Sequence, residues 1–141
     1  MKPRVVLDTN VLVSALRSKR GASFKVLSLI GTGRFDISIS VPLVFEYEEA
    51  ARRMARSAGL RGQDIDDILD YICRVAEHQR IFFLWRPYLR DPSDDMVLEL
   101  AVESGSGRIL THNVEDFRGI GRFGVRAMRP AEFLSEIGEL G

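Results

Sequence analysis

Short apolar runs recur along the chain, separated by longer segments with helical spacing. The first run, at 4–7, ends in Val-Val-Leu, which is typical of a strand buried on both faces of a parallel sheet. Residues 36–40 alternate polar and apolar positions, as a strand does. Further short runs lie at 81–85, 108–111 and 125–128. These five segments are the ones that we expect to form strands.

Between these runs, apolar residues recur at the spacing of amphipathic helices. The expected helices are 10–18, 24–30, 42–58, 63–79, 96–104 and 130–137. Strands that alternate with helices form crossover units, in which neighbouring strands are parallel. The pattern therefore predicts a single domain, residues 1–141, with an α/β fold: a three-layer α/β/α sandwich around a mainly parallel sheet.

Composition narrows the class of protein. The chain has 141 residues, 45% apolar and 28% charged, and its 20 basic residues balance its 20 acidic ones, so no general attraction to nucleic acid or membrane is expected. A local basic patch remains compatible with this balance. The single cysteine, Cys73, excludes an intramolecular disulfide and fits a reducing cytoplasmic location. No apolar run is long enough for a membrane span, and Asp8 interrupts the first run too early for a signal peptide.

Acidic residues follow two of the predicted strands. Asp8 ends the first strand, and ligands of parallel sheets bind beyond the carboxyl ends of the strands. Asp8 alone fits equally well as the N-cap of the next helix. Glu46 lies early in the helix that follows the second strand, and only this closeness separates it from Glu48 and Glu49, for which a solvated helix face is the better interpretation.

A third group of acids opens the helix at 96–104. Asp91 is a good N-cap, Pro92 suits the first helical position, and Asp94 fits the capping geometry and the helix dipole. Asp95 has no such local role. It lies one turn into an otherwise apolar helix, where an unpaired carboxylate is costly, so we assign Asp95 to the site.

Carboxylates that converge on one point repel each other unless a cation lies among them. Mg²⁺ and Mn²⁺ prefer oxygen ligands, and such an ion can activate water and stabilise charge on a phosphodiester. Zinc is disfavoured because the chain has only two histidines, His78 and His112, and one cysteine.

Four motifs, in order along nearly the whole chain, carry a family resemblance. They are Asp8-Thr-Asn10, Ser40 with Glu46 six residues later, Asp91-Pro-Ser-Asp-Asp95, and Thr111-His-Asn113-Val-Glu-Asp116-Phe117. Together they resemble the PIN-domain family, and more narrowly the VapC-like toxin components of prokaryotic toxin–antitoxin systems.

This resemblance implies a Mg²⁺- or Mn²⁺-dependent endoribonuclease, a hydrolase. Asp8, Glu46 and Asp95 match the three main acids of the family, with Asp8 and Asp95 as direct metal ligands and Glu46 helping directly or through water. Asn113 stands where many relatives carry an aspartate, and Asp116 follows it. Asparagine offers an oxygen without a charge, so one metal ion or two remain open.

Supporting residues and partners follow from the same reading. Thr9, Asn10 and Thr111 are expected on the substrate-binding side of the site, where they orient the carboxylates by hydrogen bonds. Arg17, with the two basic residues that follow it, is a candidate for contact with RNA phosphates, although an ordinary solvated helix end explains it equally well. The resemblance implies an RNA substrate, a small antitoxin partner and a homodimer.

Two other functions share features with this sequence. A phospho-aspartyl phosphatase or receiver domain also carries an aspartate after its first strand, but Asn10 occupies the place of the second phosphatase acid, and no lysine lies at a later strand end as a receiver needs. A PIN-like domain with weak or lost catalysis, acting as an RNA- or protein-binding module, is compatible with Asn113.

Overall fold

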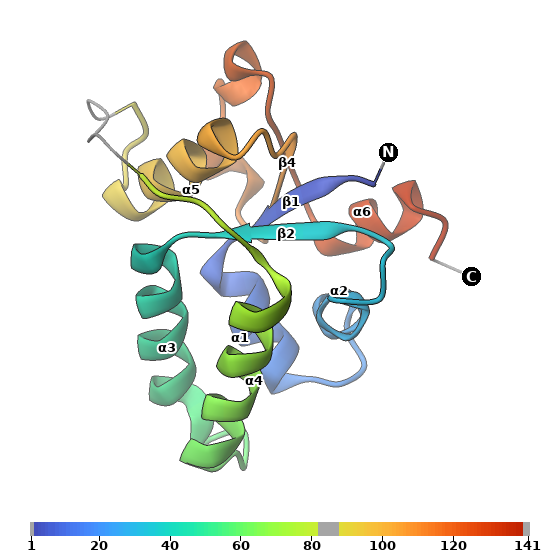
Figure 1. Ribbon diagram of the computed structural model, residues 1–141, viewed down its shortest axis with the longest axis vertical. Helices are drawn as coiled ribbons and strands as arrows, with labels where there is room; N and C mark the ends of the chain where they lie inside the picture. The colour runs from blue at the N-terminus through green and yellow to red at the C-terminus, as the bar shows by residue number, and fades with distance from the viewer. Residues whose placement is uncertain (1, 82–87, 140–141) are drawn as a thin grey trace.

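The computed structural model describes residues 2–81 and 88–139 (Figure 1). Its elements are β1 (Arg4–Leu7), α1 (Thr9–Arg17), α2 (Ala22–Leu29), β2 (Asp36–Ile39), α3 (Val41–Ala55), α4 (Gly62–Val75), β3 (Glu77–His78), α5 (Pro92–Glu103), β4 (Arg108–Leu110), the 3₁₀ turns η1 (Val114–Phe117) and η2 (Ile120–Phe123), β5 (Arg126–Met128) and α6 (Pro130–Glu136). Helices and strands alternate as the sequence pattern predicts.

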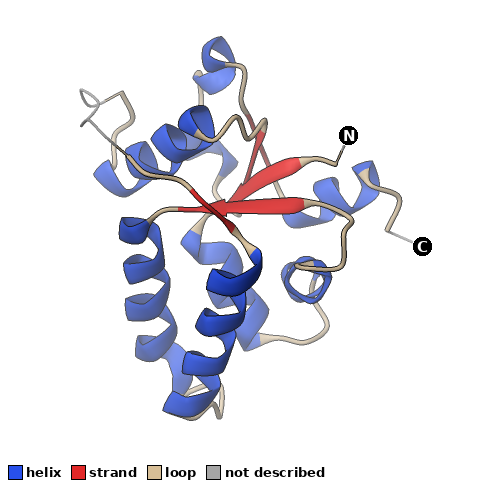
Figure 2. Ribbon diagram, in the orientation of Figure 1, coloured by secondary structure: helices blue, strands red, loops and turns tan. Residues whose placement is uncertain are grey.

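Within the described residues, five strands form one sheet in the order β3-β2-β1-β4-β5, and every neighbouring pair is parallel. Helices α1 to α4 cover one face of the sheet, and α5 lies on the other face (Figures 1 and 2). The predicted three-layer α/β/α sandwich is therefore confirmed. None of the helices in the described ranges has the length and apolar character needed to cross a membrane.

The central strands β1 and β4 explain where a ligand can bind. Val5, Val6, Ile109 and Leu110 are fully buried, which matches their continuous apolar runs. From β1 the chain moves outward to β2 and β3, whereas from β4 it moves the other way to β5. Beyond the carboxyl ends of strands at such a reversal, parallel sheets leave a crevice.

One strand lies where the sequence predicts a helix. Residues 77–78 were expected to continue a helix, but they form β3, because Glu77 pairs with Ser38 and the Gln79 N–H donates to the Ile39 carbonyl at 2.9 Å. The tertiary pairing outweighs the local helical preference. The strand expected at 81–85 lies, beyond its first residue, outside the described residues.

The starts of two helices also differ. Helix α2 begins at Ala22, with Gly21 as its N-cap, instead of at residue 24. The buried helix α5 begins at Pro92 instead of residue 96, with Asp91 as its N-cap: the Asp91 carboxylate accepts the Ser93 N–H at 2.9 Å. This confirms the predicted Asp-Pro start and brings the acids at 94 and 95 into the first turn.

Candidate active site

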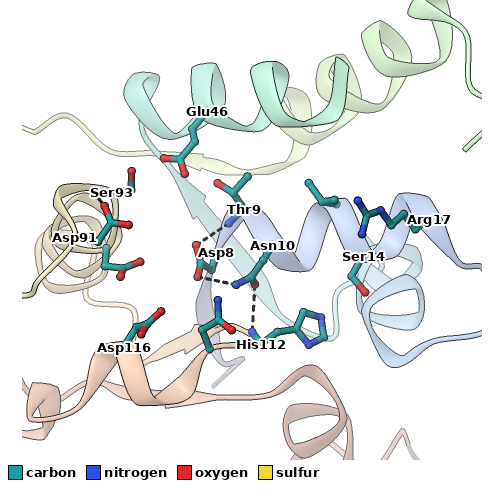
Figure 3. Close-up of a pocket in the computed structure, with 13 residues that line it drawn as sticks. Asp8, Thr9, Asn10, Ser14, Arg17, Glu46, Asp91, Ser93, His112 and Asp116 are labelled. Carbon is teal, nitrogen blue, oxygen red and sulfur yellow. Dashed lines mark hydrogen bonds between the residues drawn. The ribbon is translucent and has the colours of Figure 1, made fainter. Parts of the chain in front are cut away.

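Asp8 both caps a helix and lines a pocket. One carboxylate oxygen, Oδ1, accepts the Thr9 N–H at 2.8 Å and so caps α1. The other, Oδ2, accepts the Thr111 hydroxyl at 2.8 Å and the Asn10 amide at 3.3 Å. The side chain still lines a pocket at the end of β1 (Figure 3). The two interpretations left open by the sequence therefore describe the same residue.

Thr111 joins the ends of β1 and β4. Besides donating to Asp8, its hydroxyl oxygen accepts the Asn113 N–H at 3.0 Å, and Asn10 Oδ1 accepts the His112 N–H at 3.2 Å. Thr111 is fully buried, and its hydroxyl holds the Asp8 carboxylate in place. Thr9 orients Asp8 through its backbone N–H, and both Thr9 and Asn10 line the pocket.

Carboxylates from four segments surround this pocket. They are Asp8 after β1, Glu46 on α3, Asp91 and Asp94 at the start of α5, and Asp116 in η1. Figure 3 shows the side chains of Asp8, Glu46, Asp91 and Asp116 around one common space. The sequence prediction of Asp8, Glu46 and Asp116 at one edge of the sheet agrees with this geometry, and Asn113 lines the pocket with them.

Asp94, and not Asp95, lines the pocket. Asp95 is 8% exposed, and its Oδ1 accepts the backbone N–H groups of Tyr88 at 3.2 Å and Leu89 at 2.8 Å. The burial cost that suggested a site role for Asp95 is thus offset by hydrogen bonds to the preceding segment. Asp91 and Asp94 lie three residues apart and share one face of the first helical turn, which faces the pocket.

Asp94 had been assigned to helix capping and not to the site. Among the described contacts, the Asp91 side chain caps the helix and the Asp94 backbone N–H donates to the Asp91 carbonyl at 3.0 Å, but no hydrogen bond joins the Asp94 carboxylate to Asp91. The rotation of α5 about its axis decides which acid faces Asp8, and no local motif reveals that rotation.

Helix α3 brings Glu46 to the pocket. Ser40 caps the helix by accepting the Leu43 N–H at 3.4 Å, and the Tyr47 hydroxyl donates to the Leu7 carbonyl at 2.6 Å, which fixes the helix to the end of β1. In contrast, Glu48 and Glu49 bind Arg52 and Arg53 on the exposed face. The expectation of a solvated face for these two glutamates is confirmed.

Burial, with a further contribution from neighbouring negative charges, raises the pKa values of Asp8, Glu46 and Asp94. Burial raises the pKa of Asp8, hydrogen bonds from Thr111 and Thr9 oppose this, and the negative charges of Asp116 and Asp91 add to it. Burial also raises the pKa of Glu46, and the charge of Asp8 acts in the same direction.

The effect is largest at Asp94. Burial, followed by the charges of Asp8, Asp91 and Asp116, raises the pKa of Asp94 from 3.8 to about 7. Within the described ranges, Arg17 is the one arginine or lysine that lines this pocket. The pocket therefore holds more negative charge than its own side chains neutralise.

The donor set fits a hydrated hard cation. Its carboxylate and amide oxygens are the ligands of Mg²⁺ and Mn²⁺, and these ions keep several waters in protein sites. In the part of the chain that the structure describes, no group of three or more His, Cys, Asp or Glu side chains is positioned to hold a metal ion.

His112 lies at the pocket but outside the group of acids. Its Nε2 is 2.8 Å from the buried Ser23 hydroxyl, and burial, followed by the charge of Arg129, lowers its pKa. Arg17 is exposed at the end of α1 and lines the same pocket, as predicted, whereas the neighbouring residues 19 and 20 do not line it.

Comparison with known proteins identifies the family. The sequence pattern of the PIN domain matches residues 4–115. No curated protein matches the sequence. The fold is similar to a chain in the crystal structure of VapBC2 from Rickettsia felis bound to a DNA fragment from their promoter, with a TM-score of 0.58 and 14% identity over 89% of this chain and 98% of that chain. At this identity the likeness concerns the fold alone. Because the family pattern spans most of the chain and all four acidic segments begin within it, the protein belongs to the PIN domain family, whose members are generally nucleases.

Proposed function

We propose that the protein is a metal-dependent endoribonuclease that hydrolyses RNA phosphodiester bonds. The observation that carries this proposal is the meeting of five carboxylates beyond β1 and β4, where burial, followed by the negative charges of its neighbours, raises the pKa of Asp94 to about 7. Such a group of acids favours a divalent cation. Membership of a family of nucleases supports the reaction class.

Asp8 and Asp94 are the residues that we expect to hold a Mg²⁺ or Mn²⁺ ion, with Glu46 and Asp116 acting directly or through water. When bound, such an ion supplies charge stabilisation at the phosphoryl group and makes a nucleophile available from water at neutral pH. The protein's own side chains orient these acids. Thr111 and Asn10 hold the Asp8 carboxylate in one orientation through hydrogen bonds of 2.8 and 3.3 Å.

Substrate contacts lie on the other side of the pocket. Arg17 is exposed and offers a planar cation that can donate two hydrogen bonds to one phosphate. Asn113 adds an oxygen without a charge, so it can orient water or substrate beside the acids. Its neutrality favours a site with one strongly held ion.

The first test is cleavage of single-stranded RNA by metal-stripped protein, with Mg²⁺ or Mn²⁺ added back. We expect activity only with added ion, and a loss of at least about a hundredfold for Asp8→Asn and Asp94→Asn. Asp95→Asn should lose less, because an amide oxygen can still accept the Tyr88 and Leu89 N–H groups. Asp70→Asn, an exposed aspartate on α4, is the matched control and should behave as wild type.

Folding of each variant is checked by circular dichroism. Wild-type rates for folded Asp8→Asn and Asp94→Asn, or unchanged cleavage in EDTA, would contradict the proposal. A greater loss of activity with Asp95→Asn than with Asp94→Asn would show that Asp95, as expected from the sequence, is the acid of the site at this position.

We further propose that the protein is the toxin of a toxin–antitoxin pair in which a small antitoxin places a basic side chain among the acids. The similar fold in VapBC2 of Rickettsia felis supports this context. A homodimer is also proposed, because Val41 and Phe45, one turn apart on α3, are 67% and 65% exposed. Co-expression with the neighbouring reading frame, followed by mass measurement in solution, tests both partners.

A binding module with weak or lost catalysis is the second candidate. The uncharged Asn113 in the pocket favours it, because the site then has one fewer carboxylate than many relatives. RNA binding without cleavage in either Mg²⁺ or Mn²⁺ would select this function.

A further inference from the structure

We propose that a second groove next to the acid pocket binds single-stranded RNA beside the cleavage site. In this proposal Arg90 and Arg118 contact phosphates of the strand, and Tyr88 contacts an unpaired base. The inference rests on the proposed ribonuclease function and adds the path of the substrate and the strandedness that it selects.

The two hollows are continuous. The second groove is lined by Tyr88, Leu89, Arg90, Glu115 and Arg118, and three further lining residues belong to both hollows. These shared residues are Asp91, Asp94 and Asp116. A polymer that crosses the acid pocket from the side of Arg17 would therefore continue into the second groove without leaving the surface.

Arginines lie on both sides of the acids along this path. Several arginines elsewhere bind carboxylates, as Arg52 does with Glu48 and Arg108 with Glu136. Among the described residues, Arg17, Arg90 and Arg118 are exposed and form no ion pair, although carboxylates line the same hollows. Arginines left free on both sides of an acidic centre are suited to backbone phosphates on both sides of a scissile bond.

Tyr88 supplies a stacking surface. It is 38% exposed, its hydroxyl donates to the Gly119 carbonyl at 3.1 Å, and its ring packs edge-on against Phe123 with 5.0 Å between centroids. The Arg122 guanidinium lies 5.6 Å from the ring centroid. An aromatic ring that is anchored yet partly exposed, beside free arginines, is the combination with which proteins hold single strands. Bases of a duplex are already stacked and cannot use it.

Binding of a labelled, unstructured RNA oligonucleotide, measured by fluorescence anisotropy in EDTA at several salt concentrations, tests the groove without cleavage. The double variant Arg90→Ala, Arg118→Ala should bind roughly tenfold more weakly, and its salt dependence should fall by about 0.7 in slope for each lost phosphate contact. Arg74→Ala, an exposed arginine on α4 without an ion pair in the described structure, is the matched control and should match wild type.

Tyr88 is tested by a pair of substitutions. Tyr88→Leu should weaken binding of single-stranded RNA at least about fivefold. Tyr88→Phe should bind as wild type does, because it keeps the ring and loses only the hydroxyl bond to Gly119. Duplex RNA should bind more weakly than the single strand and should not distinguish Leu from Tyr at this position.

Unchanged RNA binding by the arginine double variant, loss by Tyr88→Phe equal to that by Tyr88→Leu, or absence of binding by wild type would overturn this inference. The first of these results would be expected if the groove instead served an acidic protein partner. Failure of the ribonuclease proposal is distinguishable, because it would appear as intact, variant-sensitive RNA binding without any cleavage on addition of Mg²⁺.

Discussion

The raised pKa of Asp94 means that the acid pocket lowers the stability of the folded protein at neutral pH. Burial and the charges of Asp8, Asp91 and Asp116 raise its pKa from 3.8 to about 7. The folded protein therefore binds this proton more tightly than the unfolded chain does. As the pH rises through the range from 3.8 to about 7, the unfolded chain loses its proton first, so the stability of the folded state falls. Partial exposure of Asp94 keeps the effect modest.

We expect Asp94→Asn to raise the melting temperature of the metal-free protein at pH 8 by roughly a few degrees, because it removes a repelled charge. At about pH 3 the gain should largely disappear, since most wild-type carboxyls are then protonated in both states. Thermal melts at the two pH values, with Asp70→Asn as the control, check this. An equal difference at both pH values would show that charge is not the cause.

Thr111 is the residue on which the orientation of Asp8 depends most. Thr111→Val keeps the shape and removes the hydroxyl that bonds Asp8 at 2.8 Å, so we expect a loss of about 1–3 kcal/mol in unfolding free energy. RNA cleavage should fall as well, and Thr111→Ser should restore much of both. Chemical denaturation and cleavage rates of the three proteins measure the effect. Full activity in Thr111→Val would show that Asp8 needs no such partner.

At the scale of elements, α5 joins the core to the site. Leu98, Leu100 and Ala101 are fully buried, while the first turn of the same helix carries Asp91 and Asp94 into the pocket. Loss of packing on this helix should therefore affect stability first and site geometry second.

Leu98→Ala is expected to cost about 2–5 kcal/mol of unfolding free energy, since it leaves a cavity beneath the sheet. Val41→Ala removes a side chain that is 67% exposed and should change stability by about 0.5 kcal/mol or less. Urea unfolding of both variants is the measurement. Similar losses for both would contradict the burial pattern of α5.

The sequence was sufficient for elements whose signal is local. The buried strands at 4–7 and 108–110 are apolar throughout most of their length, and the Asp91-Pro92 pair marks the start of α5. It was insufficient for β3, because Glu77 and His78 are exposed and become a strand only by pairing with β2. It was also insufficient for Asp94, because both acids of the first turn are locally compatible with a cap or a site.

At the scale of the molecule, the parallel arrangement of the strands brings the acids together. A parallel sheet places the carboxyl ends of β1, β2 and β4 on the same edge, so residues from distant parts of the sequence meet there. This convergence could be predicted from the alternation of strands and helices, and the family could be predicted from the four motifs. The path beyond the acids, through Tyr88, Arg90 and Arg118, depends on how residues 88–91 and 115–118 come together around one hollow, and it has no signature in the sequence.

The central claim is that this acid pocket binds a divalent cation for RNA hydrolysis. The most direct measurement is the titration of metal-stripped protein with Mn²⁺, followed by calorimetry or electron paramagnetic resonance, for wild type and folded Asp8→Asn. We predict saturable binding by wild type, competition by Mg²⁺, and strong weakening in Asp8→Asn. Absence of saturable Mn²⁺ binding by wild type, or equal binding by the variant, would contradict the account.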